Sequence, residues 1–511
     1  MEKIEINLNP TMPHLPKVDD KTKINVRYTL IAPYASVHIY FDKKAGELMY
    51  EIEEPILNTD EKDILERLEI SLGELINVNV LIEKSIESRI DYLDKTTRLL
   101  IEELGINLNE TSYKNIFYYL FRDFIGLNKI EPLIKDYFIE DIECNGVDTP
   151  VYIVHRLYRN IKTNIVYKSI DELSSFVEKL AQRCGKYISY ANPLLDGTLT
   201  DGSRVNATYT EDVSSRGPTF TIRKFTKTPF TPTQLLTLRT LSPEMLAYLW
   251  ILIEYKTNIL ISGGTASGKT TLLNAISFFI PPEARVVSIE DTRELNLPRE
   301  NWLPSVARTS LGVGDVGEVD LFSLLKNSFR QNPDYVIVGE VRGKEAFVLF
   351  QGMASGHSSL STMHADSVDT LVKRLETPPI NLSPTLLNTL DVVAVMTHAL
   401  VNKQEIRKLR EIVEIIDVNP QGIAMTNTPF MWNPREDQFY FKKDSKVFEK
   451  ITKRHGISKE ELSREFEMRT KLLFELQKRN IFEFNQVQKI INEYHKNSKT
   501  VLEAFDIIQQ K

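Results

Sequence analysis

Cysteine is almost absent from this sequence: Cys144 and Cys184 are the two examples among 511 residues. Two cysteines are too few for a disulfide framework, and they lack the paired spacing of a zinc site. We therefore interpret both as reduced thiols of a cytosolic protein. Long apolar runs are missing too. The longest, Met245 to Ile253, is far too short to span a bilayer, and the N-terminal segment lacks the apolar core of a signal peptide.

The chain has no excess of positive charge. It carries 63 lysine and arginine residues against 70 aspartate and glutamate residues, a formal net charge of -7. This balance disfavours nucleic acid as a partner, because binding to its phosphates depends on basic side chains. The 511 residues predict roughly three domains, and a hydrophobic content of 42% is ample for their cores.

A glycine-bracketed loop stands out between Asn258 and Ala275, in the sequence NILISGGTASGKTTLLNA. The apolar run before the loop predicts a buried strand, and the pattern from Thr270 onward predicts a helix. Glycine at positions 263 and 268 lets backbone N–H groups converge on phosphate oxygens, and the helix start adds partial positive charge. The loop predicts a nucleoside triphosphate site formed by Gly263, Gly264, Thr265, Ala266, Ser267, Gly268, Lys269, Thr270 and Thr271.

Two side chains of this loop have specific expected roles. Lys269 is expected to contact the β- and γ-phosphates, and the Thr270 hydroxyl is expected to bind Mg²⁺. The next apolar strand ends in a burst of carboxylates, Glu290, Asp291 and Glu294. Strand ends in open α/β sheets face the ligand crevice, so we expect these carboxylates to point at the nucleotide.

A second apolar strand, 335–338, ends at Gly339 and Glu340. This is the position of the acidic element that completes a phosphate-loop site, although Gly339 replaces the usual aspartate. Magnesium is therefore expected to depend on Thr270, on water, and on Glu340 or the cluster from Glu290 to Glu294.

Two histidines, His357 and His364, lie among small polar residues in GMASGHSSLSTMHAD. Their spacing, with no cysteine nearby, fits no familiar zinc pattern, and both could be ordinary polar histidines. The interpretation we favour is that His364 ends a strand and senses the γ-phosphate or the acidic cluster. Histidine suits this role because it can donate to an oxygen without a permanent charge.

Arginines recur upstream of the loop: Arg204 in DGSRVNA, Arg216 in SSRGPTF and Arg223 in TIRKF. Taken alone, each is most simply a solvated surface side chain. The phosphate site downstream gives them a second interpretation, as ligands of the same phosphates.

The sequence divides into five expected parts. An N-terminal α/β docking module covers 1–115, a second N-terminal subdomain with the arginines 116–226, a proline-containing linker 227–234, the nucleotide-binding core 235–420, and a C-terminal strand and helical extension 421–511. In the extension, Ser458 and Glu461 form a capping box that predicts a helix to about Lys478.

Four segments in this order resemble one family, the type II/type IV secretion ATPase superfamily. GGTASGKTT resembles its Walker A loop, SIEDTREL its Asp box, RQNPDYVIVGEVRGKEA its atypical Walker B and GMASGHSSLSTMHADS its His box. PLLDGTLTDGSRVNA and GPTFTIRKF resemble its second N-terminal subdomain, and VGE without aspartate is a trait of the family. IECNGVDTPVYIVHR is similar to the archaeal branch, and the N-terminal arm and sheet resemble the archaellum motor and assembly ATPase.

The resemblance implies an α/β fold: a RecA-like P-loop NTPase domain with a PAS-like α/β N-terminal subdomain and a helical/strand N-terminal module. It implies ATP and Mg²⁺ as substrate and cofactor. Glu294 would orient or activate the attacking water and Glu340 would hold magnesium, although these roles could be exchanged. His364 matches the family's sensor histidine. Arg204 and Arg223, with Arg216 as a further candidate, match positions that reach the nucleotide of a neighbouring subunit.

The resemblance also implies partners and a location. It implies a homo-hexameric ring at the cytoplasmic face of the cell membrane, with a polytopic platform protein, other cytoplasmic motor components and, indirectly, pilin-like subunits. The implied function is to power assembly of an archaellum, with rotation as an additional or alternative task. The alternative is an archaeal pilus or secretion ATPase that exports pilin-like subunits. Two other hypotheses are a nucleotide-binding scaffold without turnover and a nucleic acid translocase, which the net charge disfavours.

Overall fold

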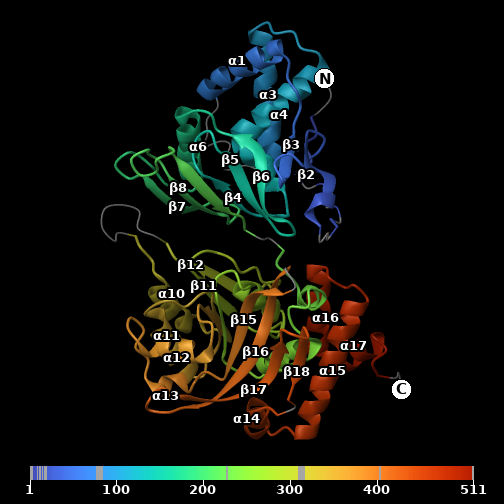
Figure 1. The fold of residues 1–511 in the computed structure, drawn as a ribbon, viewed down its shortest axis with the longest axis vertical. Coiled ribbons are helices and arrows are strands. Elements are labelled where there is room, and N and C mark those ends of the chain that lie inside the picture. The colour runs from blue at the N-terminus through green and yellow to red at the C-terminus, as the bar shows by residue number, and fades with distance from the viewer. Residues whose placement is uncertain are drawn as a thin grey trace. The chain divides into compact units, whose positions relative to one another are not determined.

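The computed structural model describes residues 4–8, 10, 13, 15–16, 20–75, 85–225, 228–308, 317–401, 404–442 and 444–508. The chain forms two compact units, Met1–Phe225 and Thr226–Lys511 (Figure 1). The boundary expected near residue 115 lies inside the first unit, and the boundary expected near 420 lies inside the second.

Unit 1 is built on a nine-stranded sheet in the order β1-β2-β3-β6-β5-β4-β9-β8-β7. Its strands are β1 (Asn25–Ile31), β2 (Ala35–Asp42), β3 (Glu47–Glu53), β4 (Ile139–Cys144), β5 (Pro150–His155), β6 (Arg159–Val166), β7 (Leu194–Thr198), β8 (Arg204–Thr208) and β9 (Thr219–Arg223). The parallel pairing of β3 with β6 joins strands from both sides of residue 115 into this sheet. Backbone hydrogen bonds therefore join the expected docking module and the expected second subdomain into one sheet.

The helices of unit 1 pack in two places. Its helices are α1 (Thr59–Leu75), α3 (Ile86–Glu103), α4 (Glu110–Leu120), α5 (Glu131–Lys135) and α6 (Ile170–Arg183), with short 3₁₀ turns at Lys21–Lys23 and Asn128–Ile130 and a π-helical turn at Phe121–Ile125. The first three enclose a core of their own that includes Leu68, Leu93 and Phe117. Helix α6 packs on the sheet. Both cysteines are free thiols, as expected.

Unit 2 also has a nine-stranded sheet, in the order β12-β11-β13-β14-β10-β15-β16-β17-β18. Its strands are β10 (Ile259–Gly263), β11 (Val286–Glu290), β12 (Trp302–Val306), β13 (Tyr335–Val338), β14 (Ser358–Met363), β15 (Val392–Val401), β16 (Gln404–Val418), β17 (Ala424–Asn433) and β18 (Gln438–Phe441). The first six are parallel and the last three join antiparallel. Strand β14 lies between the loop strand β10 and the strand β13 before Glu340, which is the order of the RecA-like P-loop fold. The expected fold class is confirmed.

Helices cover both faces of the second sheet. They are α7 (Pro232–Thr237), α8 (Pro243–Glu254), α9 (Lys269–Ser277), α10 (Leu321–Ser328), α11 (Glu345–Ala354), α12 (Val368–Glu376), α13 (Pro384–Leu387), α14 (Lys446–His455), α15 (Lys459–Lys478), α16 (Phe484–Lys496) and α17 (Ser498–Ala504), with a 3₁₀ turn at Phe329–Gln331. Ile259 and Ile261 of β10 face one apolar core, shared with α8, α9, α15 and α16, and Leu260 faces another, shared with α10, α11 and α12. This alternation places the loop strand at the centre of the unit.

The longest apolar run forms a core helix. All residues from Met245 to Ile253 in α8 are buried, which explains the absence of a polar face in this segment. Ser242 caps the helix and Pro243 occupies its first turn. Helix α15, which packs against α8, begins with the expected capping box at Ser458 and ends at Lys478, as predicted.

The second half of the expected linker is a helix and not an extended connection. Thr231 and Gln234 form a capping box at the start of α7, and Thr233 Oγ1 donates a hydrogen bond to the Ile481 carbonyl oxygen at 2.8 Å. The pattern T-x-x-Q predicts this cap, but the two prolines of the segment obscured it. Residues 231–234 of the expected linker therefore belong to the start of α7.

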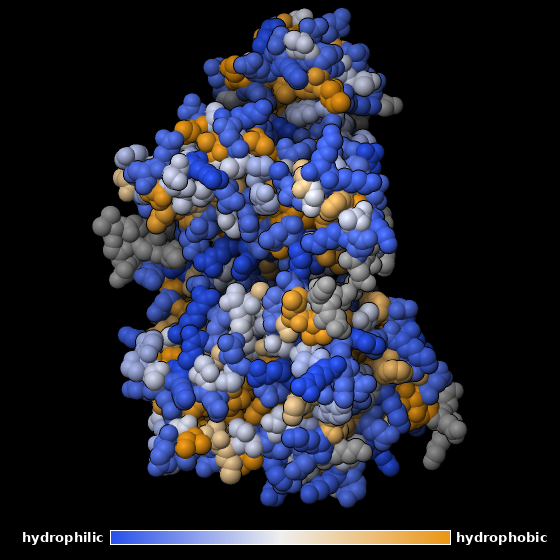
Figure 2. All heavy atoms as spheres, in the orientation of Figure 1, coloured by the Kyte–Doolittle hydropathy of each residue, from blue (hydrophilic) through white to orange (hydrophobic). Residues whose placement is uncertain are grey.

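On the face shown in Figure 2, apolar residues form small separate groups among hydrophilic ones. Within the described ranges, no helix is long and apolar enough to cross a membrane.

Candidate nucleotide-binding site

The glycine-rich loop joins β10 to α9, and two of its glycines are required by local geometry. A Cβ atom on Gly263 would lie 2.5 Å from the Met396 carbonyl oxygen on the neighbouring strand β15. Gly268 has a φ of +94°, a left-handed conformation that favours glycine. Gly268 precedes α9 and offers no side chain to cap it, so the N–H groups of the first helical turn are available to an oxygen ligand.

Lys269, His364 and Glu340 come together at the carboxyl ends of β10, β14 and β13. Lys269 Nζ donates to the Gly264 carbonyl oxygen at 2.8 Å and lies 3.3 Å from His364 Nδ1. His364 Nε2 lies 3.0 Å from Glu340 Oε1. Lys269 Nζ also lies 3.4 Å from His364 Nε2, and Glu340 Oε1 is buried without a hydrogen-bond partner, so these contacts bring the three side chains together without fixing the tautomer of His364. Three residues selected from separate segments of the sequence therefore occupy one site.

The charges of this cluster act on one another. Burial lowers the pKa of Lys269, while the carboxylates of Glu340 and Glu294 act in the opposite direction. Burial and the positive charge of Lys269 lower the pKa of His364, so its imidazole is neutral near pH 7. Glu294 is exposed and still close enough to Lys269 to influence it.

The other loop residues differ in exposure. Thr265 and Ala266 are exposed, Ser267 is buried with its Oγ donating to the Gly264 carbonyl oxygen at 2.9 Å, and Thr270 and Thr271 are half-buried in the first turn of α9. The Ser267 hydroxyl is thus turned back onto the loop and leaves the helix start open.

The expectation that Glu290 points at the nucleotide is wrong, because its side chain is buried and hydrogen-bonded within the chain. It ends β11 with 1% of its surface exposed, and its Oε1 accepts hydrogen bonds from the N–H groups of Glu294 at 2.8 Å and Leu295 at 2.9 Å. Glu290 also explains Gly339, since a Cβ there would lie 3.0 Å from Glu290 Cγ. The Glu290 side chain fills the space beside Gly339, the residue that replaces the usual aspartate. Glu290 also holds the backbone of the segment that carries Glu294.

Sequence reasoning missed three side chains beside the cluster. Arg342 Nη2 donates to Glu340 Oε2 at 2.6 Å. Arg374, on α12, donates to the His364 carbonyl oxygen. A Cβ on Gly264 would lie 3.2 Å from Asp366 Oδ1. Arg342 lies two residues after Glu340 in the sequence, and Asp366 lies two residues after His364, so their closeness in sequence is a signal for both. Arg374 has no such signal.

In unit 1, Arg204 and Arg223 are directly opposite each other on β8 and β9. Opposite residues of antiparallel strands project from the same face, so the two guanidinium groups form a pair. Arg204 donates to Asp196 at 2.9 Å, and Arg223 donates to Asp141 at 3.2 Å. The Arg223 side chain is 67% exposed and that of Arg204 is 38% exposed. Exposed ion pairs of this kind contribute little stability, so each arginine can exchange its carboxylate for another anion at small cost.

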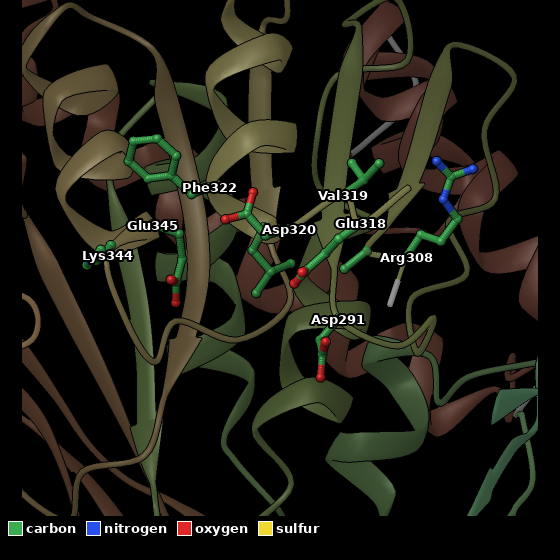
Figure 3. Close-up of a pocket in the computed structure, with 10 residues that line it drawn as sticks. Asp291, Arg308, Glu318, Val319, Asp320, Phe322, Lys344 and Glu345 are labelled. Carbon is green, nitrogen blue, oxygen red and sulfur yellow. The ribbon is translucent and has the colours of Figure 1, made fainter. Parts of the chain in front are cut away.

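A pocket of about 630 Å³ lies elsewhere in unit 2, beside α10 and α11. Figure 3 shows carboxylates from separate segments around it, with Arg308 at one side. The charged lining comprises Asp291, Glu318, Asp320, Glu345, Arg308 and Lys344. Four carboxylates against two cations would repel a triphosphate, so this pocket is not the nucleotide site.

Comparison with known families identifies the chain. The family model described as "Type II/IV secretion system protein" matches residues 131–437, which include the glycine-rich loop, the acidic strands and both histidines. The chain belongs to the type II/IV secretion system family.

Relatives of this family member come from archaea and bacteria. An uncharacterized protein of Methanocaldococcus jannaschii is 40% identical over 392 residues, which cover 76% of this chain and 70% of the relative. The type IV secretion system protein PtlH of Bordetella pertussis is 34% identical over 230 residues, 40% of this chain and 67% of PtlH. The matches from M. jannaschii agree with the archaeal branch of the superfamily.

Solved structures give a weaker likeness to this family member. The X-ray structure of the Yersinia pseudotuberculosis ATPase DotB has a TM-score of 0.40 and 14% identity, over 71% of this chain and 92% of that chain. The fold assignment above therefore depends on the strand order.

We predict that Glu290 makes unit 2 of this secretion-family protein sensitive to pH. Burial raises the pKa of Glu290 to about 7, above the value of about 4.3 in an unfolded chain. Its contribution to stability is complete below about pH 4.3 and is lost as the pH rises to about 7. Glu290→Gln copies the protonated form. The stability of the variant relative to wild type should increase by about 2 kcal/mol between about pH 5.5 and pH 8.

Thermal melts followed by tryptophan fluorescence, without Mg²⁺ or nucleotide, measure this change. They report on unit 2, because Trp250, Trp302 and Trp432 all belong to it. The control Glu300→Gln alters an exposed carboxylate of the same unit and should show no such trend. A Glu290→Gln difference that is constant over this pH range would contradict the prediction.

Proposed function

We propose that this protein is an ATP-hydrolysing motor. The observation that supports the proposal most is the meeting of Lys269, His364 and Glu340 beside an uncapped helix start, in a chain of the type II/IV secretion system family. A lysine point charge and free backbone N–H groups bind a triphosphate. A carboxylate and a neutral histidine at the same strand ends supply the groups that hydrolysis needs.

Each residue of the site has a proposed role. Lys269 contacts the β- and γ-phosphates together with the N–H groups of the loop. The Thr270 hydroxyl and the Glu340 carboxylate offer hard oxygen ligands, which suit Mg²⁺. Bound Mg²⁺ neutralises charge on the phosphate oxygens. Glu294 orients the attacking water, supported by its exposure and by the Glu290 contacts that fix its backbone. The roles of Glu294 and Glu340 could still be exchanged.

His364 is proposed as the sensor of the γ-phosphate. Its neutral imidazole links Lys269 to Glu340, so a change of charge at the γ-phosphate alters both neighbours at once. Arg342 and Arg374 hold Glu340 and the His364 backbone and so position these groups.

We infer that Arg204 and Arg223 complete the nucleotide site of a neighbouring subunit in a homo-hexameric ring. Their shared sheet face and exposed ion pairs support this role. An arginine that reaches the transferring phosphoryl group from a neighbour raises the rate of other NTPases by about 10³–10⁵.

The proposed task of the ring is to power assembly, and rotation, of an archaellum through a polytopic platform protein at the cytoplasmic face of the membrane, with other motor components and pilin-like subunits. The resemblance of the N-terminal arm and sheet supports the archaellum. The alternative is export of adhesive pilins or secretion substrates. Electron microscopy of a gene-deletion strain distinguishes them: loss of archaella supports the first and loss of other pili supports the second.

We predict that the purified protein releases phosphate from ATP in the presence of Mg²⁺, and that Lys269→Ala lowers the rate by at least about 100-fold because the β/γ charge contact is lost. The control Lys256→Ala removes an exposed lysine of the same unit that pairs with Asp334, and should retain activity. A wild-type protein that binds ATP without releasing phosphate would support the scaffold hypothesis. Stimulation of turnover by DNA would support the translocase hypothesis.

We also predict complementation between subunits. Arg204→Ala and Glu340→Ala should each be inactive alone, but a one-to-one mixture places an intact loop beside an intact arginine at about a quarter of statistical interfaces. Turnover should then recover toward about a quarter of the wild-type rate. Mixing Lys269→Ala with Glu340→Ala is the matched control, because both changes damage the same side of the interface. If turnover does not recover in the first mixture, Arg204 does not act at the nucleotide site of a neighbouring subunit.

A further inference from the structure

The glycine-rich loop follows β10, which has a neighbouring strand on each side. The residues proposed for hydrolysis lie on one of these two flanks of the loop, the β14 side. Strand β10 pairs with β14 on one side and with β15 on the other. His364 follows β14, and Glu340 follows β13 beyond it. On the opposite flank, Gly263 pairs with Met396 of β15, and His398 of β15 pairs with Arg407 of β16. A nucleotide whose γ-phosphate lies at the first flank extends toward the second.

Arg407 lies directly beside the start of α9. A Cβ atom on Gly268 would lie 3.4 Å from Met396 Cε and 3.8 Å from Arg407 Cδ. Gly268 is the residue whose bare backbone opens the helix to phosphate oxygens. The Arg407 side chain therefore shares a wall with the loop, on the flank opposite His364.

Among the described residues, Arg407 has no counter-ion. Its Nε is buried without a hydrogen-bond partner, and the described part of the chain offers its guanidinium no ion pair. Its neighbours on β16 differ: Lys408 pairs with Asp437 at 2.7 Å, and Arg410 pairs with Glu411 at 2.5 Å. A half-buried guanidinium without a carboxylate is costly in an isolated chain and is explained by an anionic ligand.

We propose that Arg407 binds the α-phosphate of the nucleotide in the same subunit. The inference depends on the proposed nucleotide site, and it adds a ligand for the part of the nucleotide that hydrolysis leaves unchanged. Lys269 and His364 mark the β/γ end, so the cation on the other flank meets the phosphate next to the ribose. Since ATP and ADP share this phosphate, Arg407 stabilises both states alike and contributes to binding rather than to the chemical step.

The test measures ADP affinity by calorimetry, and KM and kcat for ATP, in Arg407→Gln and Arg407→Lys. A lost charge-assisted hydrogen bond should raise the Kd for ADP and the KM for ATP by about 10- to 100-fold in the glutamine variant, with kcat within about threefold of wild type. Lysine keeps the positive charge but lacks the planar set of guanidinium N–H donors, so the losses of affinity in Arg407→Lys should lie between those of wild type and Arg407→Gln. Arg410→Gln, which removes a paired arginine of the same strand, is the control and should leave the ADP affinity unchanged.

Tryptophan melts without nucleotide separate binding from folding. A variant that melts as wild type and still binds ADP within about twofold of wild type overturns the proposal. If the glutamine variant is destabilised, the lysine variant decides by the same criterion. The proposed function fails separately, when wild type binds ADP but releases no phosphate from ATP. In that case a loss of ADP affinity in Arg407→Gln still supports the role of Arg407.

Discussion

A phosphate-binding loop works only if the chain leaves its backbone N–H groups unoccupied, and unit 2 is arranged to meet that constraint. Helix α9 starts at a glycine without a side-chain cap. Gly263 lets the loop turn against the Met396 carbonyl oxygen, where any Cβ would clash. Ser267 is folded back onto the Gly264 carbonyl oxygen. The fully buried strand β10 beneath the loop fixes these positions. The anion binding that we propose here depends first on backbone geometry, to which side-chain charge is then added.

The same constraint explains how charge is distributed around the loop. Burial works against the ammonium of Lys269, so carboxylates must lie close enough to maintain it, and Glu340 and Glu294 do so. A second cation at His364 would oppose this, and its lowered pKa keeps that imidazole neutral. Glu290 is buried and acts on the backbone of Glu294. Acidic residues that look equivalent in the sequence thus have different tasks in the fold.

Local signals made much of the fold and site predictable. Glycine spacing placed the loop between a strand and a helix, and the Ser458 capping box placed the start of α15. Relations across strands were not accessible, because they depend on sheet order. The pairing of Arg204 with Arg223, the reason for glycine at 339 and the position of Arg407 beside the loop all arise from neighbours far apart in sequence. The helix at 232–237 has a local capping box, but the prolines of the segment favour an extended linker in the sequence.

We propose that the site in one subunit is incomplete until Arg204 and Arg223 arrive from another. The most direct measurement is the rate of phosphate release per subunit over a dilution series, with the oligomeric state determined by light scattering at each concentration. We expect the rate per subunit to fall in step with dissociation of the ring, because Lys269 and Glu340 remain but Arg204 and Arg223 of the neighbour are lost. A verified monomer that hydrolyses ATP as fast as the assembled ring would contradict it.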